Sequence, residues 1–285
     1  MATQRRKVVV IGLGLGLGLG ACEQPEPRCN VAHGSFWAKY TLVEGDSGAC
    51  SMLTGEQLDV QSYYAPRSAT DKRPDFEKVS IAIQPMTITA ALGNAAGIEE
   101  PNADDKAYSM GLIGTARPGS DGFCRADKLS VARLRLPAVA EHPVDECTTA
   151  PEAPAYDIKY EFSRVRVYYT PSAIGTQFEA DLTYTQDDCV AKYRVSAVFP
   201  MVSCAATPAV DAGMPAADAG AVDAGEADAS AADGGVVCPP PPPPGPDPSP
   251  DDSLCENAGI NPDFALSCDP ATMMCVLAKA APSLK

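Results

Sequence analysis

The stretch that decides the fold class is residues 177–199, which read QFEADLTYTQDDCVAKYRVSAVF. Apolar or aromatic side chains occupy every second position from Phe178 to Tyr184, and again from Tyr193 to Phe199. A period of two is typical of a β-strand that buries one of its faces. The polar residues 186–188 separate the two runs. We therefore predict an antiparallel hairpin whose strands are joined by this polar turn.

Further runs with this period occur within residues 29–204, at positions 36–43, 79–83, 108–112, 129–136 and 156–169. At 108–112 the pattern predicts that Tyr108, Met110 and Leu112 share one face of a strand. Within 156–169 the apolar side chains move from even positions, up to Phe162, to odd positions from Val165, which predicts a β-bulge or bend near residues 163–164. About eight strands and no amphipathic helix predict an all-β domain, either an antiparallel β-sandwich or a small barrel.

The first 22 residues carry a targeting pattern. Three basic residues, 5–7, precede the uncharged stretch 8–21, which is short for a membrane-spanning helix and typical of the apolar region of a signal peptide. The stretch closes with Leu19-Gly20-Ala21-Cys22. Here the chain resembles bacterial lipoprotein precursors, whose lipobox ends in an invariant Cys. The resemblance implies cleavage before Cys22, acylation of its thiol and of the new amino terminus with fatty acids such as palmitate, and stable membrane anchoring.

The residue after the lipobox bears on the destination of the protein. Glu23 is not the Asp associated with inner-membrane retention, so the resemblance implies a lipid-anchored protein of the bacterial cell envelope, at the outer membrane, periplasmic or surface-exposed. The segment also begins like a dinucleotide-binding unit, but Leu17 stands where a third Gly is needed, and Pro25 follows at once. The signal peptide is the better interpretation. From Cys29 onward the chain resembles no characterised family.

Composition divides the chain into five parts: a signal peptide (1–21), a lipidated Cys with a short tether (22–28), a β domain (29–204), an acidic linker rich in Ala, Asp, Gly and Pro (205–253) and a small Cys-rich module (254–285). The linker contains repeated Asp-Ala-Gly triplets and no Lys or Arg, which predicts disorder. Its run of prolines at 239–244 is expected to act as a stiff spacer, with an aromatic-groove ligand as the alternative. We expect the C-terminal module to be tethered and to meet a second partner.

The cysteines predict an exported, disulfide-bonded protein. The chain has 11, and assigning Cys22 to the lipid leaves an even set of candidates for disulfides: Cys29, Cys50, Cys124, Cys147, Cys189, Cys204, Cys238, Cys255, Cys268 and Cys275. Because Cys189 and Cys204 bracket one extended strand, we do not expect them to bond to each other. The last four, which contain no CxxC pair and no nearby His, favour two disulfides within the C-terminal module over a zinc site.

Candidate catalytic residues are few. The segment Gly45-Asp46-Ser47-Gly48 resembles the nucleophile loop of trypsin-like serine proteases, but His33 lies too close upstream for the order of that family, and a turn explains the residues better. His33 and His142 are expected to be ordinary surface residues. We therefore expect no catalytic residue, no cofactor and no metal ligand, with an envelope hydrolase that has an unrecognised active site as the alternative.

Two features are candidates for binding. The acidic stretch 99–105 has the oxygen-bearing side chains that Ca²⁺ prefers, although a solvated loop is the better interpretation. A second candidate is an aromatic platform formed by Trp37, one ring of the pair 63–64 and one ring of the pair 168–169. Each pair contributes at most one ring, because neighbouring residues on a strand face opposite ways. The alternative is that these rings fill the core. The net charge of −15 argues against nucleic acid. We therefore predict a monomeric, anchored binding or structural protein whose ligand is a protein, a glycan or a small molecule.

Overall fold

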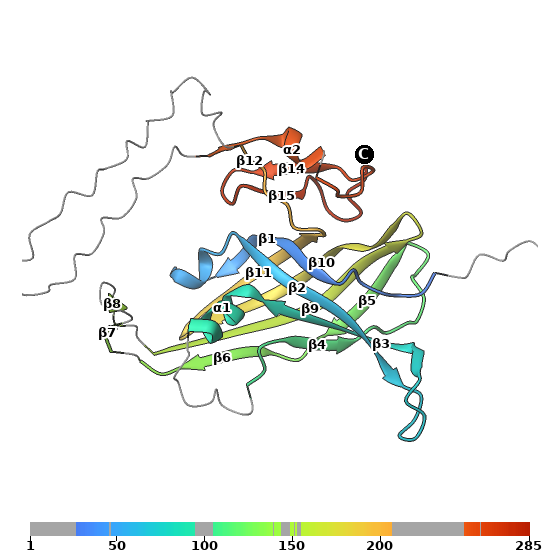
Figure 1. The fold of residues 1–285 in the computed structure, drawn as a ribbon, viewed down its shortest axis with the longest axis horizontal. Helices are drawn as coiled ribbons and strands as arrows, with labels where there is room; N and C mark the ends of the chain where they lie inside the picture. Colours follow the sequence, from blue (N-terminus) through green and yellow to red (C-terminus); the bar gives the residue numbers. More distant parts are fainter. Residues whose placement is uncertain are drawn as a thin grey trace, which may run out of the picture.

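The computed structural model describes residues 27–45, 47–94, 105–138, 140–143, 149–150, 152, 155–206, 248–256 and 258–285. The signal peptide, Cys22, Cys147, Cys238, most of the acidic linker and residues 99–104 lie outside this part of the chain. The described part is mostly β-structure, with a C-terminal segment lying against one side of a large curled sheet (Figure 1). Nowhere in the described ranges does a helix have the length and apolar character needed to span a membrane.

One antiparallel sheet of nine strands forms a nearly closed barrel from β1 (Gly34–Gly45), β2 (Gly55–Pro66), β3 (Pro74–Pro85), β4 (Ser109–Leu112), β5 (Phe123–Lys128), β6 (Ala132–Leu136), β9 (Tyr156–Thr170), β10 (Ala173–Gln186) and β11 (Cys189–Val198). The order is β4-β3-β2-β1-β11-β10-β9-β5, and β6 also pairs with β9. Across the remaining opening, the Ser130 amide donates to the Met110 carbonyl (2.8 Å) and the Gly114 amide to the Arg125 carbonyl (2.8 Å). The predicted all-β class is therefore confirmed.

The hairpin that decides the fold class forms as predicted. Strands β10 and β11 pair antiparallel, with Phe178 opposite Ala197 and Leu182 opposite Tyr193. A two-residue turn joins them, and Asp187 in this turn has a φ of 53°, a conformation that Asp adopts more readily than most residues. The even positions of β10 from Phe178 onward point into the barrel, as the alternation indicates.

The phase change in β9 is a β-bulge. The register between β9 and β10 shifts between Glu179 and Asp181, opposite Arg164, whose φ is 49°. Before this point Phe162 is buried at an even position, and after it Val165 is buried at an odd position. The bulge divides β9 into a first half that pairs with β6 and a second half that pairs with β5. One long strand thereby lines two regions of the barrel wall.

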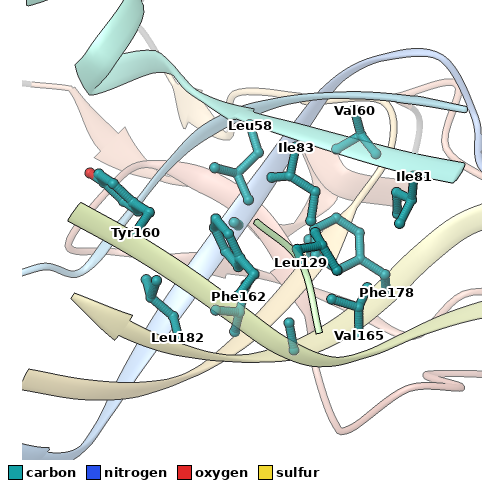
Figure 2. Packing of buried hydrophobic residues seen from close by; sticks show 14 of the residues in the cluster. Leu58, Val60, Ile81, Ile83, Leu129, Tyr160, Phe162, Val165, Phe178 and Leu182 are labelled. Carbon is teal, nitrogen blue, oxygen red and sulfur yellow. The ribbon is translucent and has the colours of Figure 1, made fainter. Parts of the chain in front are cut away.

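Aromatic and branched side chains fill the interior of the barrel (Figure 2). The ring of Phe36 on β1 packs between Phe178 and Phe199, with centroids 5.4 and 5.3 Å away. Tyr160 packs edge-on against Tyr184 at 4.9 Å. Burying a large apolar side chain stabilises the fold by about 1.5–3 kcal/mol, so these contacts form the main stabilising unit of the domain.

Two strands of the barrel sheet, β2 and β5, were not predicted, and neither was the helix α1 (Met86–Asn94), which follows β3 directly. Thr87, Ile88 and Thr89 at the start of α1 are β-branched and are weak helix formers. The helix instead depends on tertiary contacts, because Ile88 is buried in the barrel core and the Thr87 amide donates to the carboxylate of Glu56 on β2 (3.0 Å). A carboxylate at this position also suits the positive end of the helix dipole.

Strand β4 presents its larger apolar side chains outward. Tyr108, Met110 and Leu112 share a face as predicted, but the core side of the strand carries Ser109 and Gly111. The Leu129 side chain occupies the space next to Gly111, and a Cβ there would lie 2.7 Å from the Lys128 carbonyl. The inward side of β4 therefore has no room for a side chain at Gly111.

The C-terminal segment packs on the outside of the barrel. It consists of β12 (Ala205–Ala206), β13 (Ser249–Pro250), α2 (Asp252–Glu256), β14 (Leu266–Asp269) and β15 (Met274–Leu277); the remaining short elements are η1 (Ala49–Ser51), β7 (His142–Pro143) and β8 (Thr149–Ala150). Gln177 and Glu179, on the outer side of β10, are buried beneath this segment and accept the amides of Ser283 (2.9 Å) and Ala281 (2.8 Å). Polar residues on the outer face of β10 are therefore interface residues.

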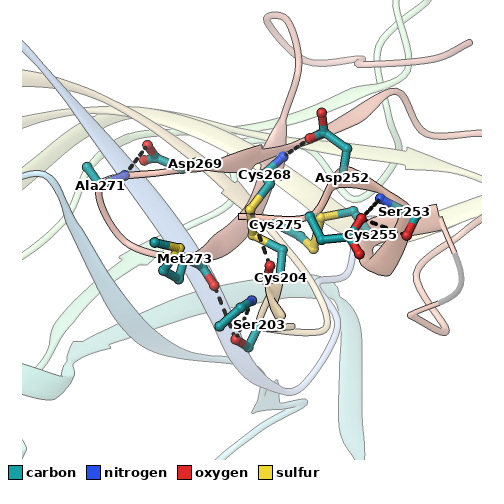
Figure 3. Close-up of a disulfide and its surroundings, with 12 residues drawn as sticks. Ser203, Cys204, Asp252, Ser253, Cys255, Cys268, Asp269, Ala271, Met273 and Cys275 are labelled. Atoms are coloured by element: carbon teal, nitrogen blue, oxygen red, sulfur yellow. Dashed lines mark hydrogen bonds between the residues drawn. A yellow bond between two sulfur atoms is a disulfide. The ribbon is translucent and has the colours of Figure 1, made fainter. Parts of the chain in front are cut away.

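Four disulfides lie in the described part of the chain: Cys29–Cys124, Cys50–Cys189, Cys204–Cys268 and Cys255–Cys275. The expectation that Cys189 and Cys204 do not bond to each other is confirmed. The expectation that the last four cysteines pair among themselves is wrong for Cys268, which bonds to Cys204 at the end of the barrel chain (Figure 3). The Cys204 amide donates to the Met273 carbonyl (2.9 Å), so the backbone at Cys204 lies beside the C-terminal hairpin. This position brings Cys204 within bonding distance of Cys268. The described part of this segment is thus bonded to the barrel.

Replacing both Cys204 and Cys268 by Ser is expected to loosen the C-terminal segment while the barrel stays folded. The disulfide spans 64 residues, and its loss should lower the free energy of unfolding by about 2–4 kcal/mol, measured by guanidinium denaturation. Limited proteolysis should then cut within residues 258–285. The control is Cys255→Ser with Cys275→Ser, which opens a 20-residue loop inside the segment and leaves its link to the barrel intact. Full protection of the segment in the first variant would contradict this account.

Candidate functional site

The structure separates the protease-like residues. His33 precedes β1 and Ser47 follows it, so a strand of 12 residues, about 40 Å when extended, lies between them. The ring nitrogen Nε2 of His33 lies 2.8 Å from the hydroxyl of Ser62, which also bonds to Asn30. Asp46 and the side chain of His142 lie outside the described residues. Gly45, the last residue of β1, is exposed, and so are Ser47 and Gly48 just before η1.

The candidate cation ligands have other roles or lie outside the described residues. Most of the acidic stretch is not described, and its last residue, Asp105, forms an ion pair with Arg135 (2.7 Å). The sulfur atoms of Cys204, Cys255 and Cys275 lie within 4.8 Å of one another, which resembles a metal site. All three sulfurs belong to disulfides, so none is available as the thiolate that a metal ion requires.

In each of the two aromatic pairs, one ring packs on the barrel core and the other lies on the outer side of the sheet, as the alternation of a strand predicts. Tyr64 packs against the barrel core and against the ring of Phe76, whereas its neighbour Tyr63 is 47% exposed on the outer face of β2. Tyr169 packs on the barrel core, and Tyr168 packs against Phe123 (5.5 Å) beneath the C-terminal segment. Tyr63 is therefore the ring of these two pairs that belongs to an exposed surface.

Tyr63 contributes to a groove of about 330 Å³ on the outer face of β2, β3 and β4, which we call the tyrosine groove; its lining residues are Asp59, Gln61, Tyr63, Ala82, Gln84, Tyr108 and Met110. Asp59, Gln61 and Tyr63 occupy alternate positions of β2. They face outward, because Leu58 and Val60 between and before them point into the core. Tyr108, just before β4, supplies a second ring that is 39% exposed. The volume is within the range of small-ligand sites in proteins.

Hydrogen bonds hold the polar side chains of the tyrosine groove in place. The Tyr63 hydroxyl donates to Gln61 Oε1 (2.7 Å), and the Gln84 amide donates to the Thr89 hydroxyl (3.0 Å). The hydroxyl of Ser35 and the amide of Gln57 both donate to Asp59 Oδ1, at 2.8 and 3.1 Å. The Gln61 amide group and Asp59 Oδ2 have no donor or acceptor among the described residues. The groove therefore offers hydrogen-bond donors and a charged acceptor near two exposed rings.

Sequence reasoning found Tyr63 and missed the rest of the groove. Asp59, Gln61, Ala82 and Gln84 were not singled out, and Tyr108 and Met110 were predicted only to share a strand face; the residues meet because β2, β3 and β4 pair side by side. The available signal was the alternation of Gln57, Asp59 and Gln61 with Leu58 and Val60.

A buried carboxylate lies at the end of the barrel near α1. Glu56 is 9% exposed, and its Oε1 accepts the hydroxyl of Tyr40 (2.9 Å) while its Oε2 accepts the Thr87 amide. Burial, reinforced by the negative charge of Glu56, holds the pKa of Tyr40 well above its usual value. The same two causes, burial first, raise the pKa of Tyr160. These tyrosines therefore stay neutral in the folded protein.

The fold and the site define a disulfide-bonded antiparallel β-barrel protein with a ligand-sized groove on its outer face. A family model named MlpA matches residues 34–200, from the start of β1 to just beyond β11, and the chain belongs to this family. Over 204 residues it is 29% identical to a Myxococcus xanthus protein named "Putative lipoprotein MlpA", an alignment that covers 69% of this chain and 76% of the relative. No solved structure matches the chain. The match corrects the expectation that the body resembles no characterised family.

The buried tyrosines predict a loss of stability in alkali. An unfolded Tyr ionises near pH 10, whereas folded Tyr40 keeps its proton, so above that pH the unfolded state binds fewer protons and gains stability. The free energy of unfolding should fall by up to about 1.4 kcal/mol per pH unit for each such residue. Urea unfolding between pH 8 and pH 11 should show a shallower decline for Tyr40→Phe, and an unchanged decline for the exposed Tyr63→Phe. An equal slope in Tyr40→Phe and the unmodified chain would show that Tyr40 ionises freely when folded.

Proposed function

We propose that this protein is a lipid-anchored binding module of the bacterial cell envelope, attached through Cys22 at the outer membrane, and that its tyrosine groove binds a glycan. The anchoring part rests on the lipobox Leu19-Gly20-Ala21-Cys22 and on the lipoprotein name of the relative. The four disulfides support an oxidising compartment outside the cytosol.

The observation that carries the binding proposal is the pair of exposed rings beside oriented polar groups. Because the barrel interior is filled by its own side chains, we place the ligand on the outer face. Tyr63 and Tyr108 are both partly exposed, and a sugar packs its C–H groups against the faces of aromatic rings. The carboxylate of Asp59 and the amide of Gln61 suit the hydroxyl groups at the edge of the same sugar.

The chemistry of the tyrosine groove favours binding without catalysis. Its lining contains one carboxylate, Asp59, whereas glycoside hydrolysis uses a pair of carboxyl groups. One negative charge and no Lys or Arg in the lining also argue against a nucleic-acid ligand. A protein partner is the competing ligand class. We propose that the protein acts as a monomer, since one groove in one chain supplies all these groups.

Anchoring predicts a change of cell fraction in Cys22→Ser. Without the thiol the chain should lose its acyl groups and appear in the soluble periplasmic or culture fraction, measured by immunoblotting after ultracentrifugation. Cys29→Ser with Cys124→Ser, which removes a disulfide and keeps Cys22, is the control and should remain with the membrane. Membrane retention of Cys22→Ser would rule out the lipid anchor.

Glycan binding predicts a loss on removal of either exposed ring of the tyrosine groove. Tyr63→Ala and Tyr108→Ala should each weaken binding about tenfold, as expected from one stacked ring, on an array of bacterial envelope glycans and by calorimetry with the best array ligand. Phe76→Ala is the control, because Phe76 is 44% exposed and lies outside the groove. An array without any bound glycan would overturn the proposal, as would equal losses in all three variants.

A further inference from the structure

A second groove lies where the barrel meets the C-terminal segment. It has a volume of about 470 Å³, and its lining includes Trp37, Glu56, Met86, Met201 and Met274. We call it the methionine groove. The tyrosine groove has no lining residue in common with it. The inference that follows is therefore independent of the proposed glycan binding.

The three methionines come from distant parts of the chain. Met86 is the first residue of α1, Met201 follows β11 and Met274 is the first residue of β15. The Met201 amide donates to the Ser35 carbonyl (3.0 Å), which holds this residue beside β1. Met274 pairs with Ser203 in an isolated β-bridge, next to the Cys204–Cys268 disulfide. Folding of the whole chain is required to bring these side chains to one groove.

The accessibility of these methionines differs from that of core methionines. Met86, Met201 and Met274 are all half-buried, so they neither fill the interior nor stand free in solvent. A thioether is a soft ligand that selects Cu(I) over the hard cations Mg²⁺ and Ca²⁺. Cysteine, the other soft ligand, is held in disulfides at every described position. In this part of the chain the methionines are therefore the available soft donors.

The charge of the methionine groove also favours a cation. Glu56 lines the groove, is 9% exposed, and takes part in none of the ion pairs formed by described residues. A buried carboxylate without a counter-ion is costly even when hydrogen bonds satisfy it, so a cation nearby stabilises it. Trp37, the one tryptophan of the chain, lines the same groove, and the face of an indole ring attracts cations.

We propose that the methionine groove binds one soft monovalent cation, Cu(I), through the thioethers of Met86, Met201 and Met274. Trp37 contributes its ring face, and Glu56 balances the charge of the ion. The site takes up the ion without a change of oxidation state. Because Met274 belongs to the C-terminal segment, whereas Met86 and Met201 are held by the barrel, the complete site depends on the Cys204–Cys268 link that fixes this segment to the barrel.

The single tryptophan provides a direct readout. We would titrate the full, lipidated chain in detergent with Ag(I), a redox-stable probe for Cu(I), in chloride-free buffer after alkylation of any free thiol. The fluorescence of Trp37 should change and saturate at one equivalent of Ag(I). Competition with a chromogenic Cu(I) chelator should then give the affinity for Cu(I) itself.

Matched variants separate this proposal from its alternatives. Met201→Leu with Met274→Leu keeps the apolar volume and removes two sulfur atoms, so the Ag(I) affinity should fall at least 100-fold while the melting temperature is retained. Met52→Leu is the control, because Met52 is 77% exposed and lies outside the groove. A site for organic cations would respond to tetramethylammonium equally in the unmodified chain and the double variant, and that result would overturn the proposal. Unchanged Ag(I) affinity in the double variant, or no saturable response of Trp37, would also overturn it.

Discussion

The filling of the barrel by its own side chains is the constraint on which the rest of the structure depends. The rings of Phe36 and Phe178 meet across the interior, and Tyr160 and Tyr184 occupy the region nearer α1. Among the described residues, close packing of this kind fills the centre of the barrel, so we look for ligand sites on its surface. Both grooves lie outside, one over β2, β3 and β4 and the other beside the C-terminal segment.

The sequence predicts best where one face of a strand is consistently apolar. That condition holds for β10 and β11, and the bulge in β9 is predicted because its apolar residues change from even to odd positions. It fails for β2, where Glu56 and Ser62 take inward positions beside Leu58 and Val60. The inward Glu56 is explained by its partners Tyr40 and Thr87, which no local pattern links to it.

The candidate sites depend still more on contacts between distant residues. Tyr63 is found from the sequence as part of an aromatic pair, but its companions Gln84 and Tyr108 join it only through strand pairing. The polar residues Gln177 and Glu179 look like a solvated face of β10 until the C-terminal segment covers them. The family match ends at residue 200, so the tyrosine groove lies wholly within the matched region, whereas the methionine groove also needs residues beyond it.

The disulfide between Cys29 and Cys124 has a mechanical consequence for an anchored protein. Cys29 lies seven residues after the proposed lipid site, ahead of the first strand of the barrel. Tension from the membrane reaches this covalent link before it reaches β1, and the link passes the load to β5, which pairs with the second half of β9. The force is thus divided between β1 and the β5–β9 region of the sheet. The hydrogen bonds of β1 are therefore not loaded one after another. In the proposed anchored protein, part of this load thereby bypasses β1, which pairs with the β2 strand of the tyrosine groove.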